Sequence, residues 1–387
     1  MKTDLQSMQD KMGEKVSKAP LADGFHRLSW KHHAIAGLAQ EWERLGCAAG
    51  SPNPFFERWF LLPSLEAFDE SGIVDLGLLV GDGKLRGLIP LFSSKSYHGR
   101  PLPHLTAWLH ANMFCGAPLV APGYEERFWS ACLQALDERP GKAWFLHLRH
   151  LPEAEPVTSA LASVCVRSGR DLRMVLETQR ALLQSDASPQ DYLASSMTTK
   201  ARKELRRQHK RLEETGRVEW HRSRNADEIE KWIGAFLKLE GKGWKGDAQS
   251  ALADDPRTRN LFRSALIGAS RRGRLERLAL RVDGEPVAML ATFLTQPGSF
   301  AFKTAFDEGY ARFSPGMQLQ LENLSLLEDQ AIEWCDSCAE PGHPMIERIW
   351  SERRSIAYYS IPIGKGWRRW AGNVWTRIEE IRQKRRR

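Results

Sequence analysis

Two Asp-Gly dipeptides, each between two apolar runs, constrain the fold of this chain more than any other feature. Asp82-Gly83 lies within residues 76–92, and Asp283-Gly284 lies within residues 278–293. A two-residue loop needs positive φ at its centre, which Asp-Gly tolerates, so both segments are predicted to be β-hairpins. Two candidate helices precede each hairpin, at 33–45, 56–68, 226–244 and 258–272. The repeated order of helices and hairpin favours an internal duplication, although two such hairpins can also arise by chance.

A chain of 387 residues is long for a single hydrophobic core, so two domains are expected. We predict an α/β fold with a mixed sheet. The predicted parts are a disordered lead-in at 1–22, modules at 23–172 and 173–365, and a basic terminal helix at 366–387. No apolar run is long enough to span a membrane and the polar start has no secretory pattern, so a cytoplasmic protein is expected.

Four further elements follow from residue patterns in the second half. Strands are predicted at 174–183, 218–221 and 299–307, and one helix at 190–215, with Gly216 as its stop. In 299–307, strict alternation would place Phe300, Phe302, Thr304 and Phe306 on one face and Ala301, Lys303, Ala305 and Asp307 on the other. The helix at 366–382 is expected to pack through Trp367, Trp370, Trp375 and Ile378.

The segment from Lys303 to Gln318 carries the main binding-site prediction. A strand ends, Pro315 and Gly316 turn the chain, and a helix begins. Ser314 is a good N-cap, and Pro315 suits the first helical position because it lacks an N–H. Unpaired N–H groups at such a helix start would bind a phosphate or diphosphate.

Basic residues and cysteines leave several interpretations open. Much of the net charge of +8 lies in 200–211 and 377–387. It could meet nucleic acid, an anionic membrane or a phosphorylated cofactor, and 200–211 could equally be a solvated helix face. The six cysteines lack paired metal-site spacing, so free thiols and no metal are expected, with Cys335 and Cys338 as weak candidates for an acyl nucleophile.

With these residues in view, the second half resembles the GNAT acyltransferase superfamily, and most of all its CelD-like, cellulose-biosynthesis-associated branch. The resemblance covers roughly residues 190–360. Its motifs are Lys200–Arg207 with Arg211–Glu213 and Gly216, Glu240–Gly246, Asp283-Gly284, Lys303, Phe306-Asp307, Ser314–Gly316, Asp336-Ser337 and Trp350 with Arg353-Arg354. The wider GNAT loop motif Arg/Gln-x-x-Gly-x-Gly/Ala is absent. The first half resembles no motif of the superfamily, so it could be a degenerate second module, as in tandem Fem-type transferases.

The resemblance implies transfer of an acetyl or other acyl group from coenzyme A to an amine. The residues it assigns to the cofactor are Thr304, Ala305, Phe306, Arg312, Ser314, Pro315, Gly316, Met317 and Gln318. The strand around Thr304–Phe306 would supply N–H donors for the thioester oxygen, because GNAT sheets splay there.

Candidate catalytic residues are Glu240, Asp307 and His343. Glu240 is the first candidate base, with a pKa raised by partial burial. Asp307 could be a second base or a turn-former, and His343 could be the acid for the departing thiolate or a structural residue. Lys303, Trp244 and Asp336 are substrate-binding candidates, and Asp336 could also hold His343; each has an ordinary structural alternative.

Three functions remain open from the sequence. The first is an acyl-CoA N-acyltransferase acting on a small amine or amino sugar, in a setting of envelope polysaccharide biosynthesis. The second is a Fem-like transferase that uses aminoacyl-tRNA and contacts it through 200–211. The third is a non-catalytic binding module.

Overall fold

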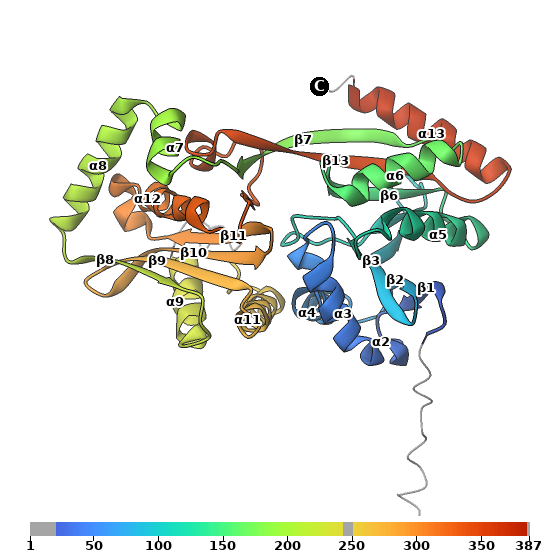
Figure 1. Ribbon diagram of the computed structural model, residues 1–387, viewed down its shortest axis with the longest axis horizontal. Helices are drawn as coiled ribbons and strands as arrows, with labels where there is room; N and C mark the ends of the chain where they lie inside the picture. Colours follow the sequence, from blue (N-terminus) through green and yellow to red (C-terminus); the bar gives the residue numbers. More distant parts are fainter. Residues whose placement is uncertain (1–20, 243–250, 385–387) are drawn as a thin grey trace, which may run out of the picture.

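A single mixed sheet of thirteen strands runs through the whole computed structural model, which describes residues 21–242 and 251–384 (Figure 1). Nearly all of the predicted lead-in at 1–22 lies outside the described residues. The strands are β1 (Gly24–Ser29), β2 (Asp75–Gly81), β3 (Lys84–Ser94), β4 (His104–Ala107), β5 (Leu119–Val120), β6 (Phe145–Pro152), β7 (Arg173–Leu183), β8 (Val218–Ser223), β9 (Leu275–Val282), β10 (Glu285–Thr295), β11 (Gly298–Phe306), β12 (Trp334–Asp336) and β13 (Glu352–Pro362).

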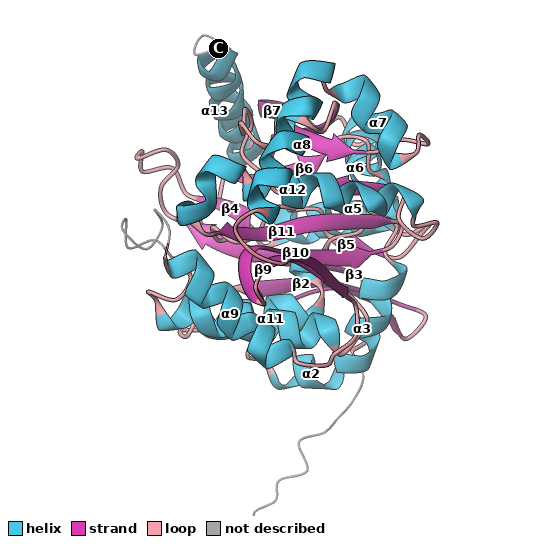
Figure 2. Ribbon diagram, turned by 90° about the vertical axis from the view of Figure 1, so that its left-hand side faces the viewer, coloured by secondary structure: helices cyan, strands magenta, loops and turns pink. Residues whose placement is uncertain are grey.

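Helices cover both faces of this sheet (Figure 2). The α-helices are α2 (His33–Gly37), α3 (Ala39–Ala48), α4 (Arg58–Phe68), α5 (Glu125–Glu138), α6 (Pro156–Arg167), α7 (Pro189–Ser196), α8 (Thr199–Glu213), α9 (Ile229–Gly241), α11 (Pro256–Ser270), α12 (Pro315–Glu322) and α13 (Trp367–Lys384). Short 3₁₀ helices are η1 (Pro54–Phe56), η2 (Glu308–Phe313), η3 (Asn323–Glu328) and η4 (Ile346–Arg348).

Both predicted hairpins are present. Asp82 and Gly83 have φ values of 55° and 68°, and Asp283 and Gly284 have values of 50° and 83°. Two central residues with positive φ are what a tight two-residue hairpin requires. The turns therefore form because Asp and Gly tolerate positive φ, as the sequence predicted. They join β2 to β3 and β9 to β10.

The sheet order shows two modules of the same design. The first half runs β1-β2-β3-β4-β6 and the second runs β8-β9-β10-β11-β12, and in each the last two strands pair in parallel. Strands β7 and β13 join these two halves of the sheet. β7 pairs with β12, β13 pairs with β6, and β7 and β13 pair with each other. The α/β class, the mixed sheet and the arrangement in two modules are confirmed. The boundary at 172/173 stays a prediction.

Aromatic side chains from both modules share one core. Phe55 and Phe60 of the first module meet Phe300 and Phe302 of the second with ring centroids 5.7 Å apart in each pair. Helices α4 and α11 pack side by side, and a Cβ at Gly268 would lie 2.9 Å from the Cβ of Trp59. The two modules therefore form one packed body.

The predicted helix at 190–215 is two helices. Met197 is extended, with φ −126° and ψ 140°, and Thr198 caps α8 by accepting a bond from the Ala201 N–H. Met197 is 8% exposed and packs in the core of the second module. The Thr198 cap and the burial of Met197 together offset the broken helix.

A bulge corrects the predicted face alternation of β11. Lys303 pairs with Ala291 and Ala301 pairs with Thr292, so Phe302 has no partner on β10. Phe300, Phe302 and Ala305 consequently share one core cluster, while Ala301 and Phe306 contact the other. Sequence alternation fails here because one extra residue reverses the faces that follow it.

The terminal helix is confirmed as α13, but two of its four expected contacts are wrong. Trp375 packs against Tyr97, Leu102 and Phe145. Trp367 and Trp370 are 67% and 68% exposed. Within the described part of the chain, α13 and the other helices are too short or too polar to cross a membrane.

Candidate active site

An open strand edge is the main structural feature of the second module. Within the described residues, β12 pairs with β11 only at Gly298, Ser299 and Phe300. Residues 301–306 continue β11 without a strand on that side, and we call this stretch the open edge of β11. The β11–β12 pairing therefore ends within the strand at which the GNAT resemblance implied a splayed sheet.

Backbone direction follows from one hydrogen bond. The Asp307 N–H donates to the Val287 carbonyl of β10 at 2.9 Å. Successive residues of a strand point their backbone groups to opposite edges. Phe306 and Thr304, which lie opposite Ala288 and Leu290, therefore direct their N–H groups away from β10 and toward the open edge. Two N–H donors thus point to the same place.

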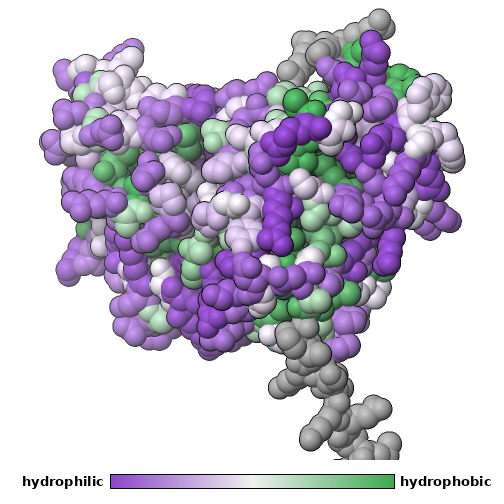
Figure 3. All heavy atoms as spheres, turned by 45° about the vertical axis from the view of Figure 1, so that its right-hand side comes forward, coloured by the Kyte–Doolittle hydropathy of each residue, from purple (hydrophilic) through white to green (hydrophobic). Residues whose placement is uncertain are grey.

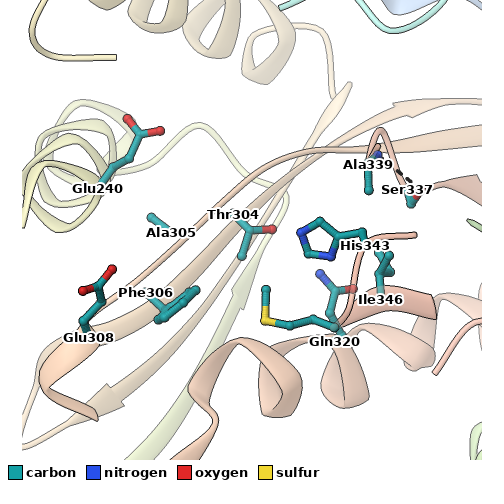
Figure 4. Close-up of a pocket in the computed structure, with 11 residues that line it drawn as sticks. Glu240, Thr304, Ala305, Phe306, Glu308, Gln320, Ser337, Ala339, His343 and Ile346 are labelled. Carbon is teal, nitrogen blue, oxygen red and sulfur yellow. Dashed lines mark hydrogen bonds between the residues drawn. The ribbon is translucent and has the colours of Figure 1, made fainter. Parts of the chain in front are cut away.

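A cavity of about 170 Å³ surrounds this edge (Figure 4). Glu240 of α9 approaches from one side of β11, and Gln320 of α12 and His343 lie on the other. The full lining is Glu240, Thr304, Ala305, Phe306, Glu308, Gln320, Ser337, Ala339, His343, Met345 and Ile346. The cavity therefore reaches both faces of the sheet, so two reactants could meet at the edge from opposite sides.

Glu240 is placed at the cavity but also has a structural role. Its side chain is 5% exposed, and one oxygen accepts a hydrogen bond from the Leu252 N–H at 2.9 Å. This bond joins the end of α9 to the segment leading into α11. Trp244, expected to shield Glu240 and to bind substrate, lies outside the described residues.

His343 lines the cavity as an uncharged group. Burial lowers the pKa of its imidazole, and the Glu347 carboxylate offsets this only in part. A neutral imidazole accepts a proton but is poorly suited to supply one as a charged acid. The acid role of His343 stays a prediction, and the lowered pKa means that the imidazole would have to accept a proton before it could supply one.

Two buried polar atoms in the lining have no hydrogen-bond partner in the structure. They are His343 Nδ1 and Gln320 Oε1, and Gln320 is 4% exposed. Leaving a buried acceptor unpaired costs about 1–3 kcal/mol, so such atoms usually meet a ligand or water. Sequence reasoning missed Gln320, because it lies in an ordinary helical stretch.

The turn from Ser314 to Gln318 differs from its prediction in detail. Pro315 is the first residue of α12, as expected, but Ser314 has φ 52° and its side chain caps nothing. A Cβ at Gly316 would lie 2.9 Å from the Met345 sulfur, so Met345 stands between Gly316 and the cavity. The turn therefore flanks the cavity without lining it.

The remaining side chains of this segment are engaged elsewhere. Gln318 donates to the Phe313 carbonyl at 2.8 Å and bonds to His209 of α8. Met317 is buried in the core. Arg312 is exposed and stacks on Phe313, with 4.6 Å between the guanidinium carbon and the ring centroid.

Two other candidates, Asp307 and Lys303, are not among the residues that line the cavity. Asp307 accepts the Gly309 N–H at 2.9 Å and lies 3.6 Å from the Lys242 ammonium, so it forms the turn. Its neighbour Glu308 lines the cavity instead. Lys303 lies over Phe114 at the junction of the modules.

Asp336 belongs to a buried ion network and does not hold His343. Its oxygens lie 3.2 Å from Arg180 and 3.1 Å from Arg354, and one accepts the Cys338 N–H at 2.8 Å. Burial opposes ionisation, but the two guanidiniums outweigh it and keep the pKa of Asp336 below its usual value. The residue ties β12 to β7 and β13.

Cysteine and metal chemistry find no support in the described residues. Burial raises the pKa of the Cys335 thiol to about 12 and that of Cys338 well above its usual value, so neither is a thiolate at neutral pH. All six cysteines are free. Across 21–242 and 251–384, no three His, Cys, Asp or Glu side chains converge as metal ligands would.

In the first module the corresponding place is filled by the chain itself. After the parallel pair of β4 and β6, the Gly116 N–H donates to the His150 carbonyl at 2.9 Å. A Cβ at Gly116 would lie 2.0 Å from the Arg149 carbonyl oxygen. Only the second module thus presents an open edge of this kind within the described residues.

Comparisons with known proteins agree with this geometry. Residues 199–341 match a family model described as an acetyltransferase (GNAT) domain. No curated protein matched the sequence.

Solved structures share the architecture at low identity. A FemX crystal structure is 10% identical over 83% of this chain and 95% of its own, with a TM-score of 0.53. A conserved protein of unknown function from Bacteroides thetaiotaomicron is 12% identical over 84% of this chain and 97% of its own, with a TM-score of 0.54. Both likenesses concern the fold. Residues 199–341 of the second half are thus similar to a GNAT acetyltransferase domain, and the chain shares its fold with the two solved structures.

Proposed function

We propose that the second module is an acyl-CoA-dependent N-acyltransferase whose reaction takes place at the open edge of β11. The observation that carries this proposal is the coincidence of two N–H donors, Thr304 and Phe306, with the unpartnered Gln320 and His343 atoms in one cavity. These groups fit the polar arm of an acyl thioester, which is extended and needs donors and acceptors along one side.

Bound acyl-CoA would supply an activated acyl group. The N–H groups of Thr304 and Phe306 would donate to the carbonyl oxygen as it gains negative charge, which is the usual reason for two aligned donors at such a site. An amine with a pKa near 10 must lose a proton for attack. His343, held neutral by burial, and Glu240, on the opposite side of the edge, are the two lining residues that we propose as proton acceptors for this step.

The diphosphate of coenzyme A would lie near the Ser314–Gln318 turn, between it and α8. Helix α8 packs against η2, and His209 bonds to Gln318, so the basic helix runs beside this turn. Its exposed basic residues are Lys200, Lys203, Arg206, Arg207, Lys210 and Arg211. Clustered cations stabilise phosphate oxygens, which favours a cofactor-facing role for α8.

Calorimetric titration with acetyl-CoA and coenzyme A tests the proposal through a pair of variants. Thr304→Pro removes the N–H at the open edge, where the β10 ladder does not need it, and Thr304→Val keeps it. We expect acetyl-CoA affinity to fall at least tenfold in Thr304→Pro and to stay within twofold in Thr304→Val. Absence of binding by the wild type, or equal affinity in both variants, would refute the proposal.

The acceptor is proposed to be a small amine or an amino sugar, in the envelope polysaccharide setting of the CelD-like branch. Turnover of acetyl-CoA with a panel of amines and amino sugars tests this. Activity on none of them, despite tight acetyl-CoA binding, would instead favour a non-catalytic binding module.

A Fem-like use of aminoacyl-tRNA is the second candidate, favoured by the exposed basic face of α8 beside the site. Filter binding of charged tRNA at rising salt separates it from the first. Tight binding that weakens steeply with salt, together with no heat of binding for acetyl-CoA, would select the tRNA donor.

A further inference from the structure

Exposed apolar side chains concentrate on the terminal helix. Six large hydrophobic residues are exposed among the described residues, and four of them lie on α13: Trp367 at 67%, Trp370 at 68%, Val374 at 40% and Ile381 at 46%. Figure 3 shows apolar surface at the upper right, where α13 lies. We call these four residues the apolar stripe of α13. Exposed apolar side chains gathered in one place usually mark a binding surface, so we expect the stripe to contact a partner.

The four residues form one face of the helix. Their spacings of three, four and seven residues place them along a single line. The opposite face is fixed: Trp375 packs against Tyr97, and a Cβ at Gly372 would lie 2.6 Å from the Trp144 carbonyl oxygen. The inner contacts therefore hold the stripe outward, so it cannot turn into the core without breaking them.

The charge around the stripe is strongly positive. Residues 365–387 contain nine Lys or Arg and two Glu, so this segment has a local net charge of +7. The acidic side chains are on the body side: Glu380 lies 3.2 Å from Arg173, and Glu379 lines a small cavity with Tyr97. Lys365 and Arg377 are exposed beside the stripe.

We propose that α13 docks this protein on an anionic lipid bilayer, lying in the plane of the interface with Trp367 and Trp370 inserted. A helix with tryptophans on one face and cations beside them is typical of interfacial binding. Tryptophan prefers the headgroup region, and nearby Lys and Arg side chains are attracted by anionic headgroups. Charge complementarity favours a bilayer over a second copy of this chain, because two copies would bring their cationic segments together.

A second basic surface, the exposed face of α8, lies on the same side of the molecule. Figures 1 and 2 both place α8 and α13 along the upper side, at opposite ends of the long β7–β13 pair. A flat anionic surface that meets α13 would thus attract α8 through long-range charge. The inference stands apart from the proposed acyl transfer, because no residue of the β11 cavity takes part in it.

Vesicle flotation with the full chain tests the proposal. Vesicles of phosphatidylcholine with 30% phosphatidylglycerol are compared with phosphatidylcholine alone at about 0.1 M salt. We expect the wild type to bind the anionic vesicles at least tenfold more strongly. The double variant Trp367→Ser/Trp370→Ser should lose at least tenfold of that affinity. Val166→Ser removes another exposed apolar side chain, 80% exposed on α6, and should bind as the wild type does.

Thermal melting and acetyl-CoA titration of the same variants show whether they remain folded. Wild-type protein that stays with the lipid-free fraction, or a folded double variant that floats as well as the wild type, would overturn the proposal. Equal binding to neutral vesicles would overturn its electrostatic part. Light scattering that finds a dimer in the wild type and a monomer in the double variant, without vesicle binding, would assign the stripe to self-association instead.

Discussion

Replacing Asp336 by Asn should destabilise the protein without removing the proposed acetyl-CoA site. The carboxylate is 1% exposed and balances two guanidiniums, those of Arg180 and Arg354, whose side chains are each 8% exposed. Asn keeps the shape and can still accept the Cys338 N–H. Within the described residues, Glu155, 2.5 Å from Arg354, is then the remaining carboxylate paired with these two buried positive charges.

The expected cost follows from the burial of this network. Removing one partner of a buried ion pair costs about 3–5 kcal/mol. Unfolding entropy per residue, summed over 387 residues, is about 0.8 kcal/mol per kelvin if the continuous sheet unfolds as one unit. Tm should therefore fall by about 4–6 °C at pH 7. Glu230→Gln, which breaks an exposed pair with Arg263, should change Tm by about 1 °C or less.

The effect should also depend on pH in a defined direction. The pKa of Asp336 is lowered in the folded protein, so its stabilising contribution is complete above the usual carboxyl pKa, about 4. It is lost as the pH falls through the lower folded value. The Tm difference between wild type and Asp336→Asn should thus be full at pH 7 and shrink in strong acid. An Asn variant that melts like the wild type but loses turnover would refute this reasoning and restore the substrate-binding role.

Three further predictions concern the site and the hairpins. If His343 is the base, kcat/KM should rise with pH through a midpoint below 6.5. His343→Gln should abolish this rise and lower the rate about 10²–10⁴-fold. An unchanged pH profile in the variant would exclude His343 as the base. Gly284 has φ 83° and no atom within 4 Å of an added Cβ, so Gly284→Ala should cost about 1–2 kcal/mol in denaturant unfolding through backbone strain alone. Gly234→Ala within α9 should instead stabilise by about 0.5–1 kcal/mol. Equal effects of the two substitutions would show that positive φ causes no strain at Gly284. Gly316→Ala should push Met345 toward the cavity and weaken acetyl-CoA binding severalfold with little change in Tm, and unchanged calorimetric affinity would show that the turn is remote from the ligand.

Local patterns predicted the parts of the fold that depend on local chemistry. Both Asp-Gly turns, the strands at 174–183 and 218–221, and Pro315 as a helix start follow from backbone preferences that act within a few residues. The helix break at Met197 was missed, although Thr198 is a good N-cap, because the buried side chain of Met197 decides it. The bulge at Phe302 carries no comparable sequence mark.

The cavity was predicted in part. Glu240, His343 and Thr304–Phe306 line it as candidates, whereas Asp307 and Asp336 turned out to serve a turn and an ion network. Gln320, Met345 and Glu308 were missed. They come from segments whose local patterns are unremarkable, and only their meeting at one strand edge makes them relevant.

The sequence by itself determined the turns, the two-module order of elements and the resemblance of the second half to GNAT enzymes, because each depends on short-range backbone preferences or on motifs read residue by residue. Tertiary structure alone decided which edge of β11 stays open, which carboxylates form ion pairs with guanidinium groups, and which tryptophans of α13 face solvent. These features depend on the pairing of β7 with β13, which joins the two modules. Because the paired residues are more than 150 positions apart in the sequence, no local pattern predicts this pairing.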